Sequence, residues 1–180
     1  RDRYMSNIKV FENDLPEDLD LSNEKLIGLD NEALGLVLGR DPLTLVQLGL
    51  ESNNFYLVKL NRETYNAPYL VKALSNNNTQ FIMHYARQDL LWLKYHLKVQ
   101  PKNIFCTKVA SKIARTASSY HGYKDLVKEL CGKDISKKEQ QSDWGDPNLS
   151  EKQIKYAASD TEYLFEIRKK LKRMLEREKR

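Results

Sequence analysis

The stretch LIGLD at residues 26–30 is a short apolar run that ends in an acidic residue. Two more apolar runs follow, TLVQLGL at residues 44–50 and FYLVKL at residues 55–60, and only the polar residues 51–54 separate them. Short apolar runs bounded by polar turn residues are typical of β-strands, and such a short connection joins antiparallel neighbours. The three runs therefore predict a three-stranded antiparallel meander.

Beyond the meander the pattern becomes mostly helical. Apolar side chains recur at helical spacing in residues 68–74, 90–97, 105–115 and 123–131, whereas residues 80–83 form one late apolar run that predicts a fourth strand. Strands first and helices later, with one late strand between them, favour an α/β fold. We expect a mixed β-sheet flanked by helices, as in the ribonuclease H-like fold.

The last helix has a clear start. Ser150 and Gln153 form a capping box, and Leu149 and Ile154 occupy the positions of a hydrophobic staple. Apolar residues continue at helical spacing towards the end of the chain, so we expect one long C-terminal helix over residues 150–178.

The rest of the chain organisation is simple. The polar residues 133–147 are expected to form a loop, and residues 1–7 a flexible or non-native leader ahead of the folded domain. We find no internal repeat and no linker, so residues 1–180 are predicted to form a single domain.

Composition excludes some classes of protein. The net charge of +5 mildly favours the binding of polyanions. The basic residues near the C-terminus are typical of a solvated helix face with i,i+4 ion pairs. No apolar run approaches the roughly 20 residues of a membrane span. Without a secretory signal, the chain is expected to be cytoplasmic, and its two cysteines to be free thiols.

Asp30 and Glu32 stand at the end of the first predicted strand. Because side chains alternate along a strand, residues two apart point to the same side of the sheet, and a hard cation fits between two such carboxylates. Taken alone this pattern is weak, since acidic residues often simply end strands.

Three further residues extend the set. Tyr156 and Asp160 are four apart on the well-capped helix and so share one helical face. Asp89 follows the fourth strand, where a strand-to-helix transition again places a carboxylate at the sheet edge. Each also has a structural interpretation: a tyrosine that covers a helix, and a first-turn aspartate that complements the helix dipole.

Four converging acids would repel one another and raise each other's pKa unless cations neutralise them. Oxygen ligands favour Mg²⁺ or Mn²⁺. Two such ions would act on a scissile phosphate, with Tyr156 positioning the attacking water or assisting with its proton. We therefore predict Asp30, Glu32, Asp89 and Asp160 as metal ligands, and these four with Tyr156 as the catalytic residues.

The motifs resemble those of the DEDD exonucleases, in the branch with a tyrosine in its third motif that includes ribonuclease D. The first motif is Leu29-Asp30-Asn31-Glu32, the second runs from His84 to Asp89, and the third is YAASD at residues 156–160. Further stretches, such as Gln141-Ser142-Asp143-Trp144, resemble the small alphaproteobacterial nanoRNase C type. The likeness covers residues 8–175.

The resemblance implies a ribonuclease H-like fold and a ring-shaped homo-oligomer, an octamer in characterised members. It implies a 3′-to-5′ exoribonuclease that cleaves short single-stranded RNA, down to dinucleotides, to 5′-mononucleotides. The residues predicted to bind substrate are Asn31, Leu34, Gly35, His84, Tyr85, Arg87, Ser142 and Trp144. For His84, Arg87 and Trp144, packing roles are the alternative, and for Trp144 at least an equal one.

The sequence departs from the family pattern at two positions. Asn31 replaces the usual threonine of the first motif, and Gln88 replaces an aromatic residue before Asp89. Neither is a predicted ligand, so we expect altered substrate fit rather than lost chemistry. Two other functions stay open: a 3′-to-5′ exodeoxyribonuclease, because the metal chemistry does not choose the sugar, and a non-catalytic nucleic-acid-binding module with the same fold.

Overall fold

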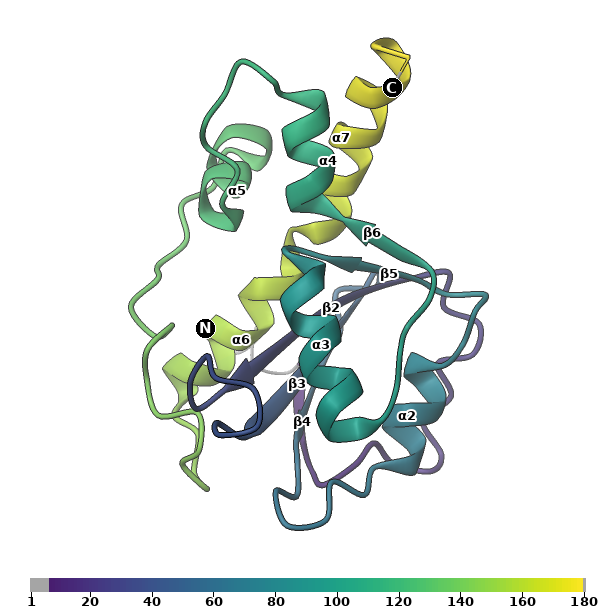
Figure 1. Cartoon of the computed structure of the whole chain (residues 1–180), viewed down its shortest axis with the longest axis vertical. Helices are drawn as coiled ribbons and strands as arrows, with labels where there is room; N and C mark the ends of the chain where they lie inside the picture. The colour runs from purple at the N-terminus through teal and green to yellow at the C-terminus, as the bar shows by residue number, and fades with distance from the viewer. Residues whose placement is uncertain (1–6, 180) are drawn as a thin grey trace.

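The computed structural model describes residues 7–179 (Figure 1). Residues 1–6 of the leader expected at 1–7 lie outside this range, as does residue 180. Asn7 is described, and its carbonyl accepts a hydrogen bond of 2.8 Å from the backbone N–H of Phe55. Asn7 is thus joined to the edge of the sheet, and the expectation of a flexible or non-native leader stays a prediction.

The described residues form one six-stranded mixed sheet in the order β1-β4-β3-β2-β5-β6. Strands β2, β3 and β4 pair antiparallel, which confirms the predicted meander, and the remaining neighbours pair parallel. The strands are β1 (Ile8–Glu12), β2 (Leu26–Ala33), β3 (Leu43–Leu50), β4 (Phe55–Lys59), β5 (Gln80–Met83) and β6 (Ile104–Cys106).

The two edge strands are absent from the sequence prediction. The sequence of β1, IKVFE, mixes three apolar residues with Lys9 and Glu12, and only Ile8 is buried. Strand β6 has three residues and runs directly into helix α4 (Thr107–Ala114). The helix predicted over residues 105–115 is therefore wrong at its start, because Phe105 and Cys106 pair with β5 instead.

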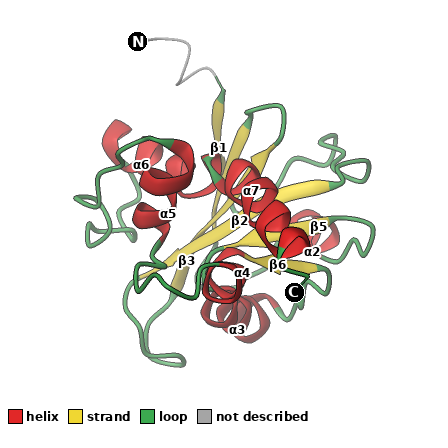
Figure 2. Cartoon of the chain, turned by 90° about the horizontal axis from the view of Figure 1, so that it is seen from above, coloured by secondary structure: helices red, strands yellow, loops and turns green. Residues whose placement is uncertain are grey.

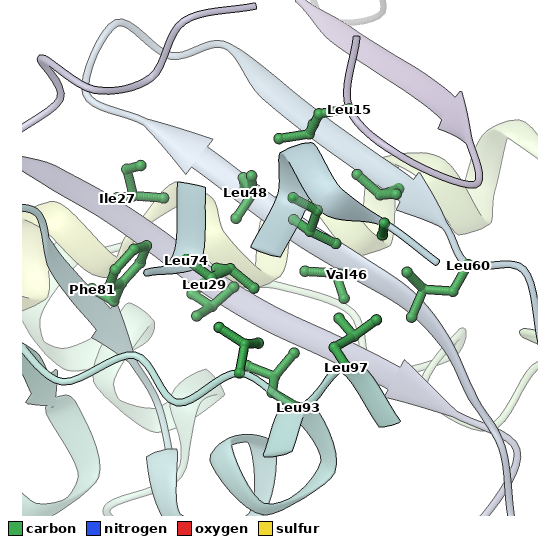
Figure 3. Packing of buried hydrophobic residues seen from close by; sticks show 14 of the residues in the cluster. Leu15, Ile27, Leu29, Val46, Leu48, Leu60, Leu74, Phe81, Leu93 and Leu97 are labelled. Carbon is green, nitrogen blue, oxygen red and sulfur yellow. The ribbon is translucent and has the colours of Figure 1, made fainter. Parts of the chain in front are cut away.

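Helices cover both faces of the sheet, which explains why every residue of β3 is buried. On one face, helix α2 (Pro68–Leu74) and helix α3 (Ala86–Leu97) pack on the strands. Leu74, Leu93 and Leu97 meet Leu29 and Val46 in this core (Figure 3). The mixed sheet flanked by helices confirms the predicted α/β architecture (Figure 2).

On the other face, helix α6 (Glu151–Glu162) lies close to the strands at two glycines. A Cβ atom on Gly49 would lie 2.5 Å from Oγ1 of Thr161, and one on Gly28 would lie 3.1 Å from its carbonyl oxygen. Such distances leave no room for a side chain. The two glycines therefore let α6 approach β2 and β3, and they bring Asp160 to the sheet.

The predicted start of α6 is confirmed. Oγ of Ser150 accepts a hydrogen bond of 3.1 Å from the backbone N–H of Gln153, whose side chain in turn accepts one of 2.9 Å from the N–H of Ser150. The predicted helix over residues 123–131 is also present, as α5 (Tyr123–Cys131).

The single long helix expected over residues 150–178 is wrong, because the chain forms α6 and then α7 (Leu164–Arg177). The hydroxyl of Tyr123 lies at the break. It donates a hydrogen bond of 2.6 Å to the carbonyl of Ser159 and accepts one of 3.3 Å from the N–H of Tyr163. In a continuous helix these two backbone groups would bond to each other, so the inserted hydroxyl interrupts the helix.

Two smaller expectations can be compared with the structure. Both cysteines, Cys106 and Cys131, are free thiols as predicted. Among residues 7–179, no helix is both long and apolar enough to cross a membrane.

Candidate active site

Three of the predicted metal ligands meet at the contact between β2 and α6. Asp30 and Glu32 come from β2 and Asp160 from α6, and one carboxylate oxygen of each lies within 4.8 Å of the others. The alternation of side chains along β2 and the close approach of α6 at Gly28 produce this arrangement. Gln47, buried on the adjacent β3, places its side-chain amide 3.5 Å from Oε1 of Glu32.

Asp89, the fourth predicted ligand, reaches the cluster from the first turn of α3. Its carboxyl interacts with that of Asp30, and its Oδ2 atom is buried without a hydrogen-bond partner among the described residues. Nδ2 of Asn31 donates a hydrogen bond of 3.3 Å to the backbone carbonyl of Asp89. Asn31, one of the two departures from the family pattern, thus ties β2 to α3 beside the cluster.

Burial raises the pKa values of all four carboxyls, and repulsion by Asp30 raises those of the other three. Burial is the largest cause of the raised pKa at Asp30, Glu32, Asp89 and Asp160. The charge of Asp30 is a further cause at the other three, and for Asp160 the charge of Glu32 adds to it. These four half-buried acids, with one buried oxygen of Asp89 lacking a partner among the described residues, are therefore poorly stabilised as bare carboxylates.

Divalent cations fit this donor set. All the donors are carboxylate oxygens, which hard ions such as Mg²⁺ prefer, and the buried Oδ2 of Asp89 has a free lone pair for a ligand. Cations would also offset the like-charge repulsion that raises the pKa of these acids. Asp30, Glu32, Asp89 and Asp160 are the residues that would hold them.

Tyr156 lies one helical turn before Asp160 and faces the same pocket. Burial, and next the charge of Asp160, raise the pKa of its hydroxyl, so the side chain is a neutral phenol. The ring of Trp144 packs against it, with the two ring centroids 5.8 Å apart. Trp144 therefore helps to hold Tyr156 in place.

A pocket of about 330 Å³ opens over the cluster. Besides Tyr156 and the acids of β2 and α6, it is lined by the predicted substrate residues Asn31, His84 and Tyr85. The ring of His84 is held by a 2.9 Å hydrogen bond between Nδ1 and the hydroxyl of Thr107. Burial, with the charge of Lys108, lowers the pKa of His84 to about 4, so its ring is neutral near pH 7.

Several residues of the pocket wall are missing from the sequence prediction. Lys108 on α4, Lys124 on α5 and Lys137 in the loop before α6 bring three cations to the pocket, which Tyr123 also lines. Nζ of Lys108 lies 4.1 Å from the ring centroid of Tyr85. Lysines are common on surfaces, so no local signal distinguishes these three. Only the packing of α4 and α5 near the sheet edge brings them together.

The other predicted substrate residues do not line this pocket. Ser142 donates a hydrogen bond to the carbonyl of Glu139 and accepts one from Gln153, and Trp144 is only 4% exposed. Ser142 and Trp144 therefore make packing contacts within the protein. Arg87 is exposed on α3 and lines a neighbouring hollow.

Leu34 and Gly35 belong to the connection between β2 and β3. Leu34 packs beside Gly145, where an added Cβ would lie 3.0 Å from Cδ2 of Leu34. A Cβ on Gly35 would lie 2.2 Å from the carboxylate of Asp41, so the position requires glycine for packing. Substrate contact by Leu34, Gly35 and Arg87 stays a prediction.

With four acids and a tyrosine gathered at a mixed sheet, the fold and the site define a nuclease-like metal-binding domain. A family model described as 3′-5′ exonuclease matches residues 8–176, so the chain belongs to the 3′-5′ exonuclease family. Within it, the chain is 32% identical over 167 residues to ribonuclease D of Xanthomonas oryzae, covering 93% of this chain and 45% of that protein. It is also 34% identical over 155 residues to DNA polymerase I of Aquifex aeolicus, covering 86% of this chain and 25% of that protein.

These relatives confirm the ribonuclease D-like resemblance, although the chain spans less than half the length of either protein. Among solved structures, that of Brucella melitensis NrnC matches with a TM-score of 0.92 and 38% identity, covering 97% of this chain and 84% of that one. The same protein has been solved with bound Mg²⁺ and bound to pGG. The similarity confirms the ribonuclease H-like fold class.

Proposed function

We propose that the chain is a metal-dependent 3′-to-5′ exoribonuclease that hydrolyses short oligoribonucleotides, down to dinucleotides, to 5′-mononucleotides. The observation that carries the proposal is the group of four half-buried carboxylates, three of which line one pocket together with Tyr156. The similarity to a nuclease solved with Mg²⁺ and with pGG supports both the metal and the short substrate.

We propose two divalent cations, Mg²⁺ or Mn²⁺, held by Asp30, Glu32, Asp89 and Asp160. When bound, they supply Lewis-acid stabilisation of the phosphate and an activated water. The neutral hydroxyl of Tyr156 orients the attacking water by a hydrogen bond.

The pocket wall binds the substrate. Lys108, Lys124 and Lys137 attract its phosphates, and neutral His84 offers a hydrogen bond rather than a charge. Tyr85 exposes 45% of its surface at the pocket mouth, where a base can stack on its ring.

The second candidate is a 3′-to-5′ exodeoxyribonuclease, which the similarity to a DNA polymerase favours. The four acids act on the phosphate and do not read the sugar, whereas discrimination needs a contact with the 2′-hydroxyl. A purely nucleic-acid-binding module is disfavoured, because it has no need for four clustered acids whose repulsion costs stability.

A time course with Mg²⁺ tests the proposal. The substrates are 5′-labelled RNAs of two, five and twenty nucleotides with matching DNAs, and Asp30→Ala is the control. At substrate concentrations above KM, where binding outside the pocket no longer limits the rate, we expect the RNA dinucleotide to disappear fastest and the control to be inert. Faster cleavage of DNA would favour the second candidate, and no cleavage of any substrate would favour the binding module.

We further propose a ring-shaped homo-oligomer, an octamer by family resemblance, located in the cytoplasm. Light scattering of the purified chain measures the mass of the assembly, and a monomer at micromolar concentration would contradict the ring. Fractionation of cells that express the tagged native protein tests the location.

A further inference from the structure

A groove runs along the exposed side of α3 and begins at the catalytic pocket. Tyr85 lines both that pocket and a neighbouring hollow of about 350 Å³. Leu38 and Leu91 line this hollow and also the next one, of about 690 Å³, which continues to Gln100 and Lys102. We call the two hollows together the α3 groove. Their shared residues make it continuous with the catalytic pocket.

The charge of the groove has one sign. Its charged residues are Arg87, Lys94, Lys98 and Lys102, and among the described residues that line the two hollows none is acidic. The two hollows are lined by twelve residues, among which the composition of the chain would place about two acids and about two cations, so the wall has an excess of positive charge. Such a wall attracts a polyanion that follows the groove.

Exposed apolar and aromatic side chains lie between these cations. Leu36 is 81% exposed, Leu91 51% and Tyr95 46%. Cations that alternate with aromatic side chains are the usual platform for single-stranded nucleic acid, because every base offers a face for stacking. Tyr85 and Tyr95 are the two aromatic residues exposed in the groove.

The opposite wall of the groove is held in place. The carboxylate of Asp41 accepts a hydrogen bond of 2.9 Å from the N–H of Val37 and pairs with Arg40. At Gly39, where φ is +87°, an added Cβ would lie 3.4 Å from the hydroxyl of Tyr95, so the connection between β2 and β3 packs against α3. Leu36 and Leu38 are therefore presented on a fixed loop.

We propose that the α3 groove binds the upstream nucleotides of a single-stranded RNA whose 3′ end lies in the catalytic pocket. The proposal rests on the proposed function and extends it to substrates longer than a dinucleotide. The span between Tyr85 and Lys98, which cap the two ends of α3, is about 20 Å at about 1.5 Å per residue. At about 3.4 Å per stacked nucleotide this length holds about six nucleotides. Substrates should gain contacts up to a length of about eight.

The test removes three cations of the groove in a variant with Lys94→Gln, Lys98→Gln and Lys102→Gln. The matched control removes three exposed cations of α7, with Lys169→Gln, Lys172→Gln and Arg173→Gln. For each protein, kcat/KM is measured on RNAs of two and eight nucleotides at several salt concentrations, and light scattering measures the mass.

We expect the groove variant to lose about tenfold or more in kcat/KM on the eight-nucleotide RNA, mainly through KM. The slope of log KM against log salt should fall by about 2, since each lost phosphate contact to a single strand contributes about 0.7. Cleavage of the dinucleotide should stay unchanged, and the control variant should match the wild type on both substrates.

Two results would overturn the proposal. One is wild-type kinetics and salt dependence of the groove variant on the eight-nucleotide RNA. The other is a changed mass of the assembly with equal losses on both substrates, which would make the groove a contact between copies of the chain.

Failure of the proposed function is distinguishable from failure of the groove. If the wild type cleaves neither RNA, the proposed function fails. Fluorescence anisotropy of a labelled eight-nucleotide RNA in EDTA still compares the binding of the three proteins. Weaker binding by the groove variant alone then supports the groove, and equal binding overturns it.

Discussion

At the scale of single residues, Asp30 has the central place in the cluster. Its charge raises the pKa of Glu32, Asp89 and Asp160, and it interacts with the carboxyls of both Asp89 and Asp160. Removing its charge therefore has opposite effects on stability and on metal binding.

Asp30→Asn should reduce cleavage by about a thousandfold or more. It removes one metal ligand, and the four acids are proposed to hold the metal ions together, so the other three cannot replace it. In a chelator the same variant should be at least as stable as the wild type, because like-charge repulsion is relieved. Thermal unfolding in EDTA and a cleavage assay in Mg²⁺ measure the two effects. A variant that cleaves normally would remove Asp30 from the proposed site.

Tyr156→Phe should lower kcat by about tenfold to a hundredfold and change KM little, since the hydroxyl is assigned to orient the attacking water. The ring still packs against Trp144, so the fold should be kept. Steady-state kinetics on the dinucleotide measure kcat and KM separately. Wild-type kcat in this variant would refute the role of the hydroxyl.

At the scale of elements, the break between α6 and α7 sets where Asp160 stands. The hydroxyl of Tyr123 occupies the position between the carbonyl of Ser159 and the N–H of Tyr163, directly beside Asp160 in the chain. The junction of the two helices thus depends on a side chain from α5.

Tyr123→Phe should lower the free energy of unfolding by about 1–3 kcal/mol, because two backbone groups lose their partner. It should also raise the Mg²⁺ concentration needed for half-maximal activity, since Asp160 follows Ser159. Tyr120→Phe, at a tyrosine that is 64% exposed, is the matched control. An unchanged melting temperature and Mg²⁺ dependence would show that the hydroxyl does not hold the junction.

Some of the strands and helices could be predicted from local sequence patterns and others could not. The meander, β5 and the capping box at Ser150 follow from local spacing, and all are present. Strand β1 mixes apolar with charged residues, and β6 has only three residues before α4 begins, so local spacing marks neither as a strand. Both form because partner strands supply the hydrogen bonds. Asp30, Glu32 and Asp160, which the sequence motifs predict as metal ligands, lie together in the structure. Ser142 and Trp144, which were predicted to bind substrate, instead make packing contacts away from the pocket.

At the scale of the whole molecule, the acid cluster links stability to pH and metal. The folded-state pKa of each of the four acids is raised, so their contribution to stability is greatest below the unfolded pKa of about 4 and is lost as the pH rises through the folded values. Cations bind the ionised carboxylates and should reverse that loss.

The rise in melting temperature on adding Mg²⁺ should therefore be small near pH 5 and larger towards pH 8. Differential scanning fluorimetry at fixed ionic strength, with EDTA as the reference at each pH, measures it. Comparing the melting temperatures with and without Mg²⁺ at one pH cancels titrating groups that do not bind the metal, such as His84 with its pKa of about 4. A Mg²⁺ effect that does not change with pH would argue against binding by the four acids.

The sequence by itself determined the meander, the start of α6 and the identity of the acids, because these depend on residues near one another in the chain. The tertiary structure alone decided the break at Tyr163, the three lysines of the pocket and the α3 groove. Each of these requires segments far apart in the chain to meet. Local spacing does not encode such contacts, since they arise only when the helices pack on the finished sheet.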